Sequence, residues 1–187
     1  MKNRFVWLAM GLALSLTATA QNRYFTKTGH IDFFSHTAVE DVKAVNEQVT
    51  SFLDIATGDM VFSVLNRSFQ FLKPLMQEHF NENYMESEKF PKASFEGKIT
   101  DLKTIDFTKP GKYPVKVAGK LTIYGVTKDI EAAGNLTTDK DKITGESVFQ
   151  VNPEDYGIKI PSVVRANFAE SMKVTVQMNY QLYTPKK

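Results

Sequence analysis

Three histidines are the side chains with the widest chemical repertoire in this sequence, which contains no cysteine. His30, Asp32 and His36 fall on one face of an extended strand, and two imidazoles with a carboxylate can bind a metal ion. At ~3.3 Å per residue, however, His30 and His36 lie about 20 Å apart, so only a bend or a bulge would bring both to one ion. We therefore expect no metal site.

Catalytic motifs are also scarce. The absence of cysteine excludes thiol nucleophiles, no G-x-S-x-G elbow marks a nucleophilic serine, and no glycine-rich loop marks a phosphate site. We expect no catalytic residue and predict that the protein is not an enzyme. If it did act on a lipid in an internal pocket, as a hydrolase or an isomerase, His36, His79 and Asp32 would be the first candidates.

Strands must position these side chains, because apolar residues recur at every second position along most of the chain. Near the C-terminus, Met172, Val174 and Val176 alternate with polar neighbours, which predicts a strand with one buried and one wet face. The predicted strands span residues 26–35, 42–54, 59–66, 93–101, 112–124, 128–137, 142–151 and 171–183. Short turns that contain Gly, Asn or Asp separate most of them, so neighbours should pair antiparallel.

Two segments depart from this alternation. Residues 73–84 have apolar side chains three and four positions apart, which predicts a short helix that begins around Pro74. Residues 161–171 lack alternation and should form a loop or a short helix. The fold class is therefore all-β with one short helix, and long strands with glycines on their apolar faces favour a closed barrel over a sandwich.

The N-terminus has the pattern of a signal peptide. Lys2 and Arg4 precede an apolar run of about a dozen residues, too short to span a bilayer, and Ala18 and Ala20 give the small-x-small pattern of a cleavage site. We predict a signal peptide over residues 1–20, one domain over residues 21–187, and no membrane segment after cleavage. Loss of Lys2 and Arg4 lowers the number of basic residues from 23 to 21, which equals the number of acidic residues. The mature chain is therefore neutral and lacks the excess of positive charge typical of a nucleic-acid-binding protein.

Several motifs in order resemble those of the YceI-like family of exported bacterial polyisoprenoid-binding barrels. Residues 121–128 (LTIYGVTK) are similar to the family's L-T-I-H-G-V-T-K hairpin, with Tyr124 in place of the usual His. Residues 79–80 and 84–87, followed by 89–97 (KFPKASFEG), resemble its helix and K-Y-P-x-x-x-F stretch, and residues 155–158 (DYGI) its D-F-G-I turn. The resemblance implies an eight-stranded, antiparallel, lipocalin-like β-barrel that holds an isoprenoid or another long-chain lipid and needs no other cofactor.

The predicted site is the lumen of that barrel. Its lining residues should be Phe33, Phe62, Val64, Phe95, Val115, Val117, Leu121, Ile123, Ile130, Phe149, Val174 and Val176. Phe80, Tyr84, Val163 and Phe168 should stand at the mouth as a gate. The only partner that we expect is a hydrophobic small molecule, bound to a monomer or a homodimer that is periplasmic or secreted. The alternative is an exported barrel with a filled core that acts through its surface as a stress-linked interaction protein.

Overall fold

The computed structural model describes residues 22–140 and 142–184, so the predicted signal peptide (residues 1–20) lies outside the described residues. In this part of the chain the strands are β1 (Arg23–His36), β2 (Asp41–Asp54), β3 (Asp59–Leu65), β4 (Gln70–Phe71), β5 (Lys92–Ile99), β6 (Gly111–Ile123), β7 (Val126–Asp139), β8 (Lys142–Val151) and β9 (Met172–Leu182). All of their pairings are antiparallel.

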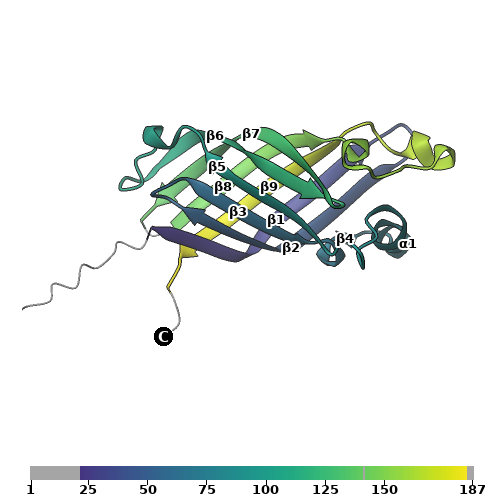
Figure 1. The fold of residues 1–187 in the computed structure, drawn as a ribbon, viewed down its shortest axis with the longest axis horizontal. Helices are drawn as coiled ribbons and strands as arrows, with labels where there is room; N and C mark the ends of the chain where they lie inside the picture. The colour runs from purple at the N-terminus through teal and green to yellow at the C-terminus, as the bar shows by residue number, and fades with distance from the viewer. Residues whose placement is uncertain (1–21, 141, 185–187) are drawn as a thin grey trace, which may run out of the picture.

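These strands close into a barrel (Figure 1). Hydrogen bonds link them in the order β1-β9-β8-β7-β6-β5-β3-β2, and the pairing of β1 with β2 completes the ring. The two-residue strand β4 is an addition that pairs with Ala44 and Val45 of β2. The predicted eight-stranded antiparallel barrel is thus confirmed.

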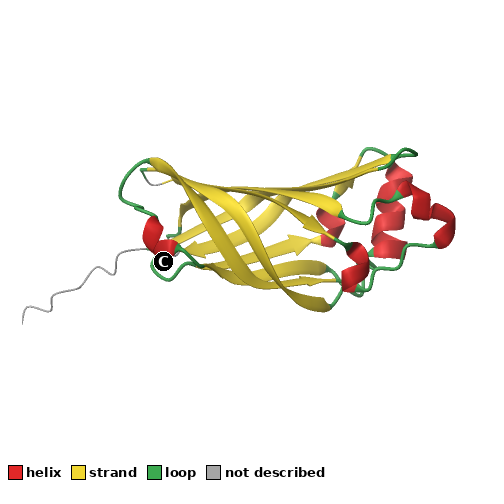
Figure 2. Ribbon diagram, turned by 90° about the horizontal axis from the view of Figure 1, so that it is seen from above, coloured by secondary structure: helices red, strands yellow, loops and turns green. Residues whose placement is uncertain are grey.

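Most of the short helices cover one end of the barrel, and another lies at the opposite end (Figure 2). The predicted helix is present as α1 (Pro74–His79), which continues into a π-helical turn, η2 (Phe80–Tyr84), where the Met85 amide donates to the Phe80 carbonyl over 2.8 Å. The other short helices are η1 (Asn66–Ser68), η3 (Leu102–Thr104), η4 (Pro153–Tyr156) and η5 (Ser162–Asn167). No helix in the described residues has the length and apolarity needed to cross a membrane.

The opposite end of the barrel is packed with side chains. Leu53, Ile143, Met178 and Tyr180 are almost completely buried there. The Tyr180 hydroxyl and the Ser51 hydroxyl form a hydrogen bond of 2.8 Å, and Ser51 also donates to the Val61 carbonyl. Because the buried polar groups are paired, this end forms a satisfied core that closes the barrel.

A bulge in β1 changes which side chains point inward. Thr26 and Gly29 are both buried although they are three positions apart, and the register with β2 shifts on both sides of Gly29. A β-carbon at residue 29 would lie 2.3 Å from the Met178 sulfur, so any larger residue there would require the flexible Met178 side chain to shift. Beyond the bulge, Ile31 and Phe33 point into the barrel, while His30 and Asp32 point out.

The wall opens between β7 and β8 towards the helical end. Their ladder runs from Asp139 with Lys142 only as far as Gly134 with Ser147. β7 continues to pair with β6 as far as Val126, and β8 with β9 as far as Val151. We call this unpaired stretch, residues 126–133 of β7 facing 148–151 of β8, the β7–β8 seam.

Candidate functional site

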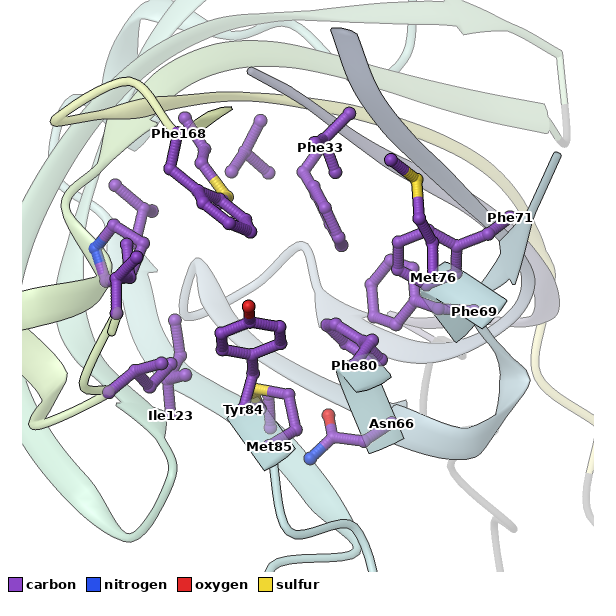
Figure 3. A pocket seen from close by; sticks show the side chains of 18 of the residues that line it. Phe33, Asn66, Phe69, Phe71, Met76, Phe80, Tyr84, Met85, Ile123 and Phe168 are labelled. Atoms are coloured by element: carbon purple, nitrogen blue, oxygen red, sulfur yellow. The ribbon is translucent and has the colours of Figure 1, made fainter. Parts of the chain in front are cut away.

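Two cavities occupy the interior of the barrel, and the inner one reaches the packed end at Met178 and Tyr180. The outer cavity, of about 280 Å³, lies beneath α1, η2 and η5, and the inner cavity, of about 130 Å³, lies deeper among the strands (Figure 3 shows a cavity wall from close by). The two cavities share five wall residues: Ile31, Val64, Ala93, Leu121 and Phe149. Apolar wall therefore continues from one space into the other.

All twelve side chains predicted to line the lumen lie on these walls. Those of the outer cavity alone are Phe33, Ile123 and Val174; those of the inner cavity alone are Phe62, Phe95, Val115, Val117, Ile130 and Val176; Val64, Leu121 and Phe149 line both. They come together because antiparallel pairing places the inward faces of successive strands side by side.

Four phenylalanines from separate elements form one wall of the outer cavity. The ring centroid of Phe33 on β1 lies 5.2 Å from that of Phe69, 5.8 Å from that of Phe71 and 5.7 Å from that of Phe80. The rings of Phe71 and Phe80 are 5.0 Å apart. Such aromatic contacts, together with a hydrogen bond from the Phe71 amide to the side-chain oxygen of Gln77, fix α1 and η2 over the barrel.

The predicted gate is present in part. Phe80, Tyr84 and Phe168 line the outer cavity, and the rings of Tyr84 and Phe168 meet at a centroid distance of 5.4 Å. Val163 does not belong to this wall: its exposed fraction is 89%, and the next residue, Val164, lines the cavity instead. Both residues belong to η5, whose 3₁₀ turn directs adjacent side chains to different sides.

Loops and short helices supply further wall residues that were not predicted. They are Asn66, Phe69, Phe71, Met76, Met85, Ile158 and Ile160. Asn66 ends the predicted strand 59–66, in phase with Phe62 and Val64, and the others belong to no period-2 run. The density of Phe and Met between residues 69 and 85 could have indicated Phe69, Phe71, Met76 and Met85, but it does not extend to Ile158 or Ile160.

Few charged side chains reach the cavities. Among the described residues that line either space, none is Lys or Arg; Glu40 and His79 reach the outer cavity, and Glu146 the inner one. Glu40 pairs with Lys73 at 2.5 Å and Glu146 with Lys112 at 3.4 Å, so both carboxylates have a cation beside them. Burial raises the pKa of Tyr84, so its hydroxyl is protonated at neutral pH.

The histidine cluster lies outside the barrel and does not assemble as a three-residue group. His30 contacts Asp32 at 3.1 Å and Glu47 at 2.8 Å, whereas His36 bonds to Asp41 at 2.6 Å. Within residues 22–140 and 142–184, no group of three or more potential ligands is arranged to hold a metal ion. Of the three residues named for a lipid-acting enzyme, only His79 lines a cavity.

Tyr124 acts away from the cavities. Its hydroxyl donates to the Glu86 carboxylate, and its ring packs 4.4 Å from that of Phe90. It thus ties the β6–β7 turn to the segment that follows η2. The departure from the family's usual His at this position therefore leaves the apolar walls unchanged.

The fold and the cavities define an eight-stranded antiparallel barrel, filled at one end and hollow and apolar at the other. The family model of the YceI-like domain matches residues 16–182, so the chain belongs to the YceI-like family. A comparison with curated protein sequences found no significant match.

Solved structures show the same fold. A polyisoprenoid-binding domain from Saccharophagus degradans, implicated in plant cell wall breakdown, is 11% identical with a TM-score of 0.75, over 87% of this chain and 99% of that one. Burkholderia cenocepacia BcnA is 13% identical with a TM-score of 0.68, over 81% and 95%. The Campylobacter jejuni YCEI protein is 17% identical with a TM-score of 0.58, over 81% and 90%.

Proposed function

We propose that this protein binds an isoprenoid or another long-chain amphiphilic lipid in the two cavities, and that it carries or stores the lipid outside the cytoplasm. The observation that carries the proposal is the apolar wall shared by the outer and inner cavities. A chain that follows this wall would gain about 0.8 kcal/mol for each buried CH₂ group. That gain offsets much of the cost of leaving a membrane.

Family and fold give independent support. The S. degradans domain is described as polyisoprenoid-binding, and this chain shares its fold. The hollow end favours a ligand over the alternative of a completely filled barrel that acts only through its surface. With no Lys or Arg among the described wall residues, the site suits burial of an apolar chain better than chemistry on a charged substrate.

The proposal places the protein in the periplasm. Residues 1–20 would direct export, and the mature barrel would act in an aqueous space beside membranes, where a lipid needs a soluble container. Entry would pass between η2 and the loop after η5, where Tyr84 meets Phe168. One monomer, or each subunit of a homodimer, would hold one ligand.

Two tryptophan substitutions on opposite faces of the wall test the proposal. Val117 lines the inner cavity, whereas Val148 on β8 is 58% exposed. Val117→Trp should fill the inner cavity and weaken uptake of a fluorescent long-chain isoprenoid by about tenfold or more, while Val148→Trp should bind it like the unmodified protein. Thermal unfolding of both variants reports that they are folded. Unchanged uptake by a folded Val117→Trp variant would overturn the proposal.

A further inference from the structure

Asn66 brings an unsatisfied acceptor to the outer cavity. Asn66 is only 1% exposed to solvent and lines that cavity, yet its side-chain oxygen accepts no hydrogen bond from any described residue. Buried polar atoms are nearly always paired, because an unpaired one has lost its hydrogen bonds to water without replacement. An unpaired oxygen in the wall of an otherwise apolar cavity is a candidate contact for a ligand.

The orientation of the Asn66 amide is fixed. Its nitrogen donates to the Phe90 carbonyl over 2.7 Å, and a flipped amide would set two oxygens against each other. The backbone is fixed too, since the Asn66 amide donates to the Pro91 carbonyl over 3.0 Å. Figure 3 shows the oxygen turned to the side on which Phe80 and Tyr84 stand, and a ligand would reach it once the neighbouring wall side chains shift.

Tyr84 provides a second polar group in the same cavity. Figure 3 shows its hydroxyl directed into the open space, while its ring packs against the ring of Phe168. This hydroxyl can donate to a ligand oxygen, whereas the oxygen of Asn66 can only accept. Together the two groups match a ligand group that both donates and accepts, which is the property of a hydroxyl.

Charge restricts the head group further. None of the described residues that line the outer cavity is Lys or Arg, and the one carboxylate among them is Glu40, which already pairs with Lys73. A phosphate or carboxylate head would enter this apolar space with no Lys or Arg in the lining to compensate its charge. A neutral group avoids that cost.

We propose that the outer cavity is a head-group site, in which the side-chain oxygen of Asn66 accepts a hydrogen bond from a neutral hydroxyl on the ligand while the apolar chain extends into the inner cavity. This inference rests on the proposed function, because it names the polar end of the same ligand. Asn66 would then determine specificity by rejecting ligands that cannot donate.

Three probes with one shared chain test the head group: geranylgeraniol, its methyl ether and its monophosphate. The unmodified protein should bind the alcohol about tenfold more tightly than the ether, which lacks the proton that Asn66 requires. The monophosphate should bind more weakly than the alcohol. Equal affinity for alcohol and ether, or strongest binding of the phosphate, would overturn the assignment. Failure of all three to bind would instead contradict the proposed function.

Two variants then show which residue causes the preference for the alcohol over the methyl ether. Asn66→Leu should bind the alcohol and the ether with about equal affinity. Tyr84→Phe should weaken both, because its hydroxyl donates to the oxygen that both probes have, and should keep their ratio. If the ratio is lost in Tyr84→Phe and kept in Asn66→Leu, the assignment to Asn66 is wrong. Should Asn66→Leu fail to fold, the comparison of probes on the unmodified protein still decides.

Discussion

At the scale of single residues, His30 forms a network of charged contacts on the outer surface of the barrel. Its two ring nitrogens contact Glu47 and Asp32, on either side of the imidazole. Partial burial by itself lowers the pKa of His30, but hydrogen bonds and charge attraction from Glu47 and Asp32 outweigh that effect and leave the pKa raised above 6.5. The cluster is therefore an ion-pair network rather than a ligand site.

This network makes a prediction about pH. A histidine whose pKa is raised on folding stabilises the protein fully below the unfolded value of about 6.5, and the contribution is lost as pH rises through the folded value. Glu47→Gln should lower the pKa of His30 in an NMR titration. It should also reduce the free energy of unfolding by up to about 1 kcal/mol in mild acid, and by less above pH 8.

The control for that prediction is Glu131→Gln, which removes an exposed carboxylate on β7, a strand that does not pair with β1 or β2. It should leave the titration of His30 unchanged. A His30 pKa that stays the same in Glu47→Gln would contradict the contact between the two side chains.

Residues on regular strands were predictable, and residues in loops were not. The twelve predicted wall positions follow from period-2 alternation, because side-chain direction on a strand is fixed by parity. Phe71 lies where no period holds, and its place depends on the pairing of β4 with β2. In η5 it is Val164 rather than Val163 that lines the outer cavity, and the 3₁₀ turn there has neither the period of a strand nor that of an α-helix.

At the scale of elements, the β7–β8 seam is the main departure from a regular barrel. The turn between β6 and β7 has two left-handed residues, Tyr124 and Gly125, so Ile123 and Val126 beside it form a hydrogen-bonded pair. From there the even-numbered amides of β7 point to β6 and the odd-numbered amides point to β8. In the seam, the odd-numbered ones have no strand to bond with.

Hydrogen exchange should reveal this pattern. The amides of Thr127, Asp129 and Glu131 should exchange much faster than those of Lys128 and Ile130, which pair with β6. Asn135 and Thr137 are the internal control, because they are odd-numbered residues of the same strand whose partners on β8, Glu146 and Thr144, are present. Equal protection of all the odd-numbered amides would show that the seam is paired in solution.

The sequence indicated the strands but neither the seam nor the bulge. Hydrophobic alternation reports which face of a strand is buried, and it does not report how far a ladder extends. The bulge at Gly29 reverses the inward parity between Thr26 and Ile31, and that reversal became clear only from the two neighbouring strands. Turn residues such as Gly125 located the hairpins correctly because a left-handed backbone restricts the choice of residue.

At the scale of the whole molecule, one part of the barrel interior is packed with side chains and another part is hollow. Large side chains such as Leu53 and Tyr180 fill one end, while the outer cavity occupies the end beneath the helices. Without cysteines, the packed end and the strand ladders must hold the fold together. The hollow end can then accept a ligand without being needed to close the barrel.

Native mass spectrometry of the protein purified from its own host tests the central claim most directly. The account predicts a mass above that of the polypeptide by one bound molecule, which organic extraction removes and which is then identified as an isoprenoid or another long-chain lipid. A polypeptide that carries the mass of the bare chain, with no lipid in the extract, would contradict it.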